Sequence, residues 1–120
     1  MKDVFVKALY ETIIEDGEKL YKKLYENTTQ EECRVDYWKE ALGLYHMLDE
    51  HQKNVLMKIV KQTMIDTVSG VFGVLDGVVT LSDCDFKCKV EINGIDTENE
   101  LQDTFLAFVE ENKVKTNFSW

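Results

Sequence analysis

The chain has 120 residues, of which 44% are hydrophobic, and a formal net charge of −9. Its length indicates a single domain, residues 1–120, and its apolar content is that of a globular protein rather than a disordered one. An acidic chain of this kind repels nucleic acid and anionic membranes, and no apolar run approaches the roughly 20 residues that span a bilayer.

Three helices are predicted in the first part of the chain, where no proline interrupts the pattern. Apolar residues at helical spacing predict the first helix over about 3–26 and the second over about 33–47. The third is expected to begin near Asp49 or Glu50 and to continue as far as Leu75.

The period of the apolar pattern then changes from helical to alternating. Residues 78–81 form a short β-branched run, and apolar side chains alternate with charged ones over residues 86–92. The polar residues 82–85 between them predict a turn, so the two runs are expected to pair as an antiparallel hairpin. Asn93 and Gly94 are expected to end its second strand.

A last helix is predicted over about 97–111. Thr97 and Glu100 have the spacing of a capping box, in which a hydroxyl and a carboxylate satisfy two backbone N–H groups at the start of the helix. The expected fold class is therefore α+β and mainly helical, with about four helices and a two-strand antiparallel hairpin between the third and the fourth.

Acidic residues are concentrated in the part of the chain that follows the third predicted helix. Ten carboxylates lie between Asp76 and Glu111, and only Lys87 and Lys89 oppose them there. A surface field of one sign raises the encounter rate with an oppositely charged molecule, so this region predicts a basic protein partner. The residues expected to contact that partner are Asp83, Asp85, Glu91, Glu98 and Asp103.

Two groups of metal-ligating residue types occur in the chain. His46, Glu50 and His51 lie near the junction of the second and third predicted helices, but the two histidines are five residues apart and do not share a helix face. Cys84 and Cys88 lack the second pair of ligands that a zinc site requires. We therefore expect a capped, solvated junction and unreactive thiols, with no catalytic residues, no metal and no cofactor.

The N-terminal sequence and the cysteine count predict a cytoplasmic protein. Lys2 and Asp3 directly follow the first residue, which is not the pattern of a signal peptide. Cys33, Cys84 and Cys88 are an odd number, which is typical of free thiols in a reducing compartment.

Four short segments resemble small acidic bacterial cytosolic domains of unknown function: residues 45–52 (YHMLDEHQ), 65–68 (IDTV), 75–77 (LDG) and 100–106 (ELQDTFL). Chains of this kind are similar in size and acidity to the immunity proteins that neutralise toxin domains. The resemblance implies a bacterial interaction protein. It implies no site residues, because immunity surfaces differ between toxins.

Three functional hypotheses follow. The first is a non-enzymatic acidic binding protein, an immunity-type inhibitor that docks on a basic protein such as a toxin nuclease, with Phe118 and Trp120 as apolar anchors or as part of the core. The second is a helical scaffold protein that self-associates as a homodimer and has no catalytic role. Its contacts would be the tyrosines of the helices, Tyr10, Tyr21, Tyr25, Tyr37 and Tyr45. The third is a metal-dependent enzyme built on His46, Glu50 and His51.

Overall fold

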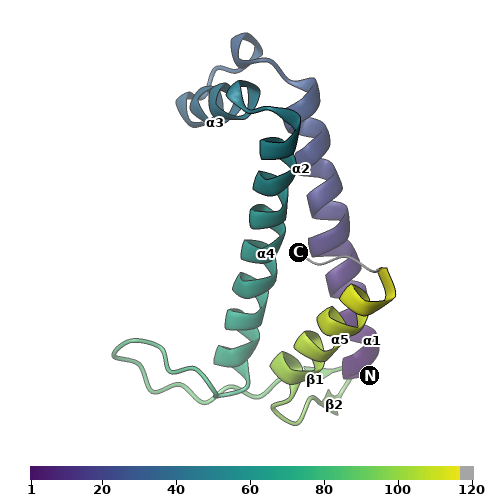
Figure 1. Cartoon of the computed structure of the whole chain (residues 1–120). Helices are drawn as coiled ribbons and strands as arrows, with labels where there is room; N and C mark the ends of the chain where they lie inside the picture. Colours follow the sequence, from purple (N-terminus) through teal and green to yellow (C-terminus); the bar gives the residue numbers. More distant parts are fainter. Residues whose placement is uncertain (117–120) are drawn as a thin grey trace.

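The computed structural model describes residues 1–116, and the side chains of residues 1–113. The molecule is elongated, with extents of 48 × 38 × 23 Å. A long N-terminal helical rod and α4 run side by side, α3 crosses their upper end, and α5 packs with the hairpin at the lower end (Figure 1). The elements follow in the order α1 (Lys2–Leu9), η1 (Tyr10–Glu15), α2 (Asp16–Asn27), η2 (Gln30–Glu32), α3 (Asp36–Met47), α4 (Glu50–Leu75), β1 (Glu91–Ile92), β2 (Ile95–Asp96) and α5 (Leu101–Thr116).

The mainly helical fold with one antiparallel hairpin is confirmed. The predicted first helix is continuous over residues 2–27, but the π-helical segment η1 divides it into α1 and α2. The hairpin therefore follows α4, the fourth α-helix, and precedes α5. Its predicted place between a third and a fourth helix is wrong, because the apolar spacing did not reveal that division.

The hairpin is also built from different residues than expected. The predicted strands 78–81 and 86–92 do not pair; instead β1 and β2 align Glu91 with Asp96 and Ile92 with Ile95. Asn93 and Gly94 form the turn between them, with φ angles of 52° and 79°. Two consecutive positive φ angles are typical of the type I′ turn, whose twist matches that of paired strands. The Asn-Gly pair thus ends the strand that contains residues 91–92, as predicted, and also makes the turn to β2.

The main core lies in the lower half of the molecule, where α1, η1, α4 and α5 meet. Phe105 of α5 is at its centre, with its ring centroid 5.5 Å from that of Phe72 and 6.3 Å from that of Tyr10. Fully burying one such side chain contributes about 1.5–3 kcal/mol. The buried members of this core are Val6, Tyr10, Ile14, Ile65, Phe72, Leu101, Phe105 and Val109.

A buried carboxylate joins the end of α4 to the start of α5. Asp76 accepts hydrogen bonds from the backbone N–H groups of Leu101, at 3.2 Å, and Gln102, at 2.7 Å. Both donors belong to the first turn of α5, whose N–H groups have no partner within the helix. A negative charge there also interacts favourably with the helix dipole. Asp76 is therefore the cap of α5, although it lies 25 residues before it in the sequence.

The prediction that Thr97 and Glu100 form a capping box at the start of α5 is wrong. The Thr97 side chain is buried, and its hydroxyl donates to the carbonyl oxygen of Val90 at 3.1 Å. Glu98 and Asn99 have φ angles of 59° and 56°, which an α-helix does not allow. The helix consequently begins at Leu101 and continues to Thr116.

A smaller aromatic cluster holds α3 against the upper ends of α2 and α4. Tyr45 is buried, and its ring centroid lies 5.2 Å from that of Tyr25, which in turn is 5.8 Å from Trp38. The ammonium group of Lys53 lies 5.0 Å from the Tyr45 ring centroid, within the range of a cation–π contact. Among the described residues, no helix is both long enough and apolar enough to cross a membrane.

We predict that Asp76→Ala lowers the free energy of unfolding by about 2 kcal/mol, because it leaves two backbone donors at the start of α5 without their acceptor. Urea denaturation followed by circular dichroism measures this change. Asp85→Ala, the same substitution at an exposed loop position, is the control and should change stability by less than about 0.5 kcal/mol. Equal effects of the two substitutions would show that Asp76 does not cap α5.

Candidate partner-binding surface

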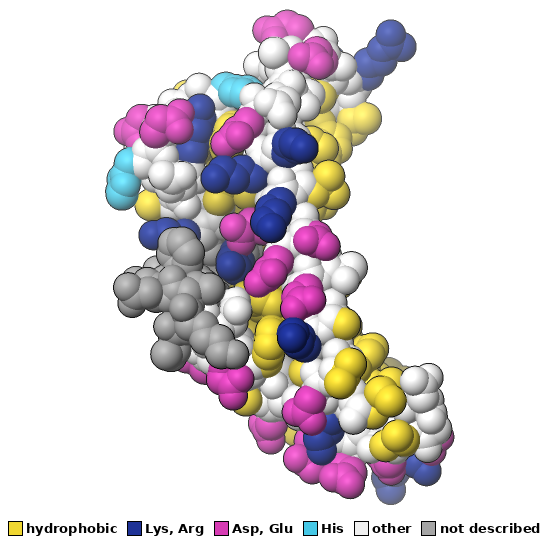
Figure 2. All heavy atoms as spheres, turned by 90° about the vertical axis from the view of Figure 1, so that its right-hand side faces the viewer, with side chains coloured by type: hydrophobic (Ala, Val, Ile, Leu, Met, Phe, Trp, Pro, Cys, Tyr) yellow, Lys and Arg dark blue, Asp and Glu magenta, His cyan; other side chains and the backbone are white. Residues whose placement is uncertain are grey.

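The carboxylates predicted to bind a partner all lie at the lower end of the molecule. We call this region the acidic end and define it as loop 77–90, the β1–β2 hairpin and residues 97–103. Acidic side chains gather at this end in the space-filling view (Figure 2). The five predicted contact residues all have exposed side chains and come from all three parts of it: Asp83 and Asp85 from the loop, Glu91 from the hairpin, and Glu98 and Asp103 from residues 97–103.

Two of these five residues already have a basic neighbour. The Lys2 ammonium lies 3.5 Å from both Glu98 and Glu100, and Lys89 lies 3.0 Å from Glu91. Desolvation opposes the charge of Lys2, but the attraction of Glu100 and Glu98 outweighs it and raises the pKa of Lys2. The hydrogen bond to Glu91 and its negative charge likewise raise the pKa of Lys89. Exposed pairs of this kind contribute little to stability, so their carboxylates remain available to a partner.

Within the residues that the structure describes, Asp83, Asp85 and Asp103 form no ion pair with Lys, Arg or His. Asp83 has a φ angle of 56°, a left-handed conformation that aspartate tolerates better than most residues. The structure thus brings the predicted residues to one end of the molecule, where loop 77–90 carries two aspartates together with Lys87 and Lys89.

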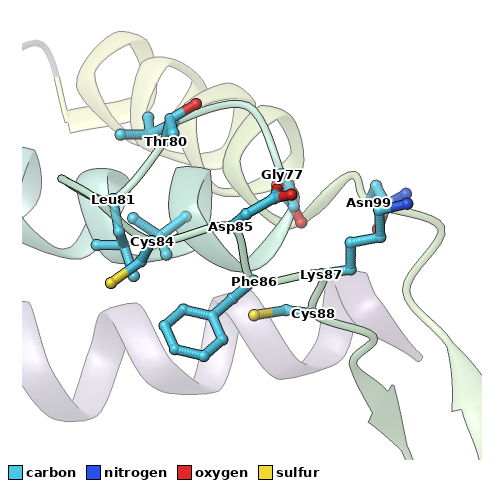
Figure 3. Close-up of a pocket in the computed structure, with 12 residues that line it drawn as sticks. Gly77, Thr80, Leu81, Cys84, Asp85, Phe86, Lys87, Cys88 and Asn99 are labelled. Carbon is cyan, nitrogen blue, oxygen red and sulfur yellow. The ribbon is translucent and has the colours of Figure 1, made fainter.

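Loop 77–90 encloses a hollow of about 380 Å³ against the end of α4. Asp85 and Phe86 point to opposite sides of the loop backbone, with Asp85 directed toward Gly77 and Phe86 away from it (Figure 3). Lys87 and Asn99 complete the wall on the side of α5. Connections of this length without regular structure are uncommon in compact domains and are often functional.

Apolar side chains in this loop are exposed next to the aspartates. Phe86 is 71% exposed and Val78 is 68% exposed, and Leu81 is also exposed. The strand predicted over 86–92 would have half-buried Phe86, so that expectation is wrong. Large apolar side chains held in water beside charges are typical of surfaces that bind another protein. The predicted anchors Phe118 and Trp120 lie outside the described residues.

The sequence did contain a signal that would have identified this loop. An Asn-Gly pair flanked by alternating apolar residues is a strong indication of a two-residue hairpin turn. Placing the turn at Asn93 and Gly94 moves the strands to residues 91–96 and leaves residues 77–90 as a loop.

The histidine-containing junction has a structural role. The Asp49 carboxylate accepts from the backbone N–H of Gln52 at 2.8 Å, and the Gln52 side chain accepts from the N–H of Asp49 at 3.0 Å. This capping box confirms the predicted start of α4. The His46 Nε2 donates to the carbonyl oxygen of Thr28 at 2.9 Å and so ties α3 to the end of α2. Among the described residues, no three His, Cys, Asp or Glu side chains are placed to hold a metal ion together.

Comparisons of the chain with protein-family models, with curated proteins and with solved structures found no match.

We predict that Phe86→Ala changes the free energy of unfolding by less than about 0.5 kcal/mol, because the ring already lies in water. Phe105→Ala, which removes a fully buried ring, should cost about 3–5 kcal/mol in the same urea denaturation experiment. A loss of more than about 1.5 kcal/mol in Phe86→Ala would place this ring in the core and remove it from the binding surface.

Proposed function

We propose that this chain is a non-enzymatic binding protein whose acidic end docks on a basic protein partner. The observation that supports the proposal most strongly is the composition of loop 77–90, which presents Phe86 and Val78 to solvent beside Asp83 and Asp85. Protein interfaces combine apolar anchors that become fully desolvated with a charged rim that sets orientation. Both parts are present within this one loop.

The charge of the acidic end defines the chemistry of the partner. A surface with several exposed carboxylates is complementary to Lys and Arg side chains and is repelled by phosphate groups. Enzymes that act on nucleic acid carry such Lys and Arg surfaces, because they must neutralise the phosphate backbone of their substrate. A toxin nuclease therefore fits as the partner, and the chain would act as its immunity-type inhibitor.

The mechanism of such an inhibitor follows from the arrangement of the loop. Long-range attraction by Asp83, Asp85 and Asp103 would accelerate the encounter with the basic surface. Phe86 would then enter an apolar site on the partner and slow dissociation. Inhibition would result from steric occlusion of the surface that otherwise binds phosphates, which requires no catalytic residue in this chain. The free thiols of the chain suit the reducing cytoplasm predicted for it.

The test is the capture of partners from a lysate of the native host on immobilised protein, with washes at about 0.1 M and then about 0.5 M salt. We predict a basic protein that is retained at low salt and released at high salt. We further predict that Asp83→Asn with Asp85→Asn reduces its association rate at least about tenfold, because two unpaired charges of the steering field are lost. Asparagine keeps the left-handed conformation of residue 83 accessible.

The matched control is Glu26→Gln with Glu31→Gln, which removes the same charge from exposed positions near the upper end of the molecule. This variant should bind the captured protein at close to the wild-type rate. Equal association rates for the two double variants would contradict docking through loop 77–90, and an acidic or salt-insensitive partner would contradict the electrostatic basis of the proposal.

A further inference from the structure

Two of the three cysteines of the chain lie in loop 77–90. Cys84 is exposed and Cys88 is half-buried, and both line the hollow that this loop encloses against the end of α4. The Cys88 side chain points back along the loop toward Phe86 and Cys84 (Figure 3). Two thiols that line one hollow from the same loop are a pair that oxidation can join into a disulfide.

The stretch of chain between the two cysteines is not held by backbone hydrogen bonds. Residues 84–90 contain no turn or bend, and in the described part of the chain residues 85–89 form no hydrogen bond between backbone groups. The loop is held at residues 78–79, which donate to the end of α4, and at Val90, which accepts from the segment before α5. The stretch between these points can therefore bend without losing a backbone hydrogen bond.

A disulfide between Cys84 and Cys88 requires a turn that the described loop lacks. The Cα atoms of two disulfide-bonded cysteines are about 4.4–6.8 Å apart, whereas four extended residue steps span up to about 14 Å. Closing this turn would move the three residues that the cysteines enclose, which are Asp85, Phe86 and Lys87. Two of them, Asp85 and Phe86, are side chains on which the proposed docking depends.

We propose that Cys84 and Cys88 form a site that a hydroperoxide oxidises to a disulfide, and that the disulfide weakens docking of loop 77–90 on its basic partner. The second part rests on the proposed function, whereas the first part does not. Cys84 reacts first because it is the exposed thiol, and Cys88 completes the bond. Unreactive thiols are expected from the sequence because it does not show that both line one hollow.

The oxidation proceeds in two steps. The Cys84 thiolate attacks one oxygen of the hydroperoxide and the O–O bond breaks, which leaves a sulfenic acid on Cys84 and releases an alcohol, or water from hydrogen peroxide. The Cys88 thiolate then attacks the Cys84 sulfur, the S–O bond breaks, and the hydroxyl group leaves with a proton as water. The two thiols together lose two electrons and two protons, and the hydroperoxide takes up both.

The site is tested by treating the full chain with hydrogen peroxide and alkylating the remaining thiols. Trypsin cleaves after Lys61, Lys87 and Lys89, so the disulfide should link the peptide 62–87 to the dipeptide 88–89. We predict these linked peptides in protein whose intact mass is that of one chain, and their separation by dithiothreitol. Absence of the linked peptides, or linkage only between two chains, would overturn the proposal.

The matched control is Cys33→Ser, which removes the third thiol from the segment between η2 and α3. This variant should form the linked peptides as the wild type does, whereas Cys84→Ser and Cys88→Ser should not. All three variants should keep the circular dichroism spectrum of the wild type, because none of these cysteines belongs to the buried core. A disulfide that requires Cys33 would contradict the pairing.

The effect on docking is measured with the basic protein captured from the lysate. We predict that oxidation lowers the affinity of the wild type at least about tenfold, because the turn moves Asp85 and Phe86. Dithiothreitol should restore the affinity, and peroxide should leave that of Cys84→Ser unchanged.

The outcomes separate this inference from the proposed function. Unchanged affinity in fully disulfide-linked protein would overturn the effect on docking and leave the proposed function standing. Capture of no basic protein would remove the proposed function and the effect on docking together. The linked peptides would in that case still decide whether Cys84 and Cys88 form the oxidation site.

Discussion

The lower half of the molecule depends on the contact between the Asp76 carboxylate and the first turn of α5. This contact fixes the direction in which α5 leaves the hairpin, and through α5 it places Phe105 in the core against Phe72 and Tyr10. A buried carboxylate is costly to desolvate unless its charge is hydrogen-bonded, and the helix terminus supplies both donors and a favourable dipole. The same contact therefore gives the buried Asp76 carboxylate its hydrogen-bond donors and gives the N–H groups at the start of α5 their acceptor.

The acidic end depends on this contact as well. Loop 77–90 and the hairpin connect the two elements that Asp76 joins, so both of their ends are held although the loop itself has no regular structure. Thr97 adds a second tie through its hydrogen bond to the carbonyl oxygen of Val90. A loop that is anchored at both ends can expose Phe86 and Asp85 at low entropic cost on binding.

The sequence predicted the helices better than it predicted the connections between them. Helical spacing located the long helices because their apolar residues repeat over many turns, and the Asp49 cap fixed the start of α4. The role of Asp76 could not be predicted, because capping across 25 residues has no local signature. The strand predicted over 86–92 forms only at Glu91 and Ile92, which pair with β2, whereas the Asn-Gly pair at 93–94 makes the turn that its sequence indicates.

The sequence predicted the acidic residues of the candidate site but not its apolar residues. The concentration of carboxylates after residue 76 is a property of the sequence, and the five acidic residues chosen from it are exposed at one end of the molecule. The apolar members of that surface were missed, because the sequence alone does not show whether Phe86 lies in a half-buried strand or in an exposed loop.

The most direct test of the account is carbodiimide coupling in a lysate of the native host, because this reagent joins a carboxylate to a lysine in direct contact with it. Mass spectrometry then identifies both residues of each coupled pair. The account predicts coupling of Asp83, Asp85 and Asp103 to lysines of one basic protein partner. Coupling of these carboxylates only to Lys22 or Lys58 of a second copy, or to lysines of many unrelated proteins, would contradict it.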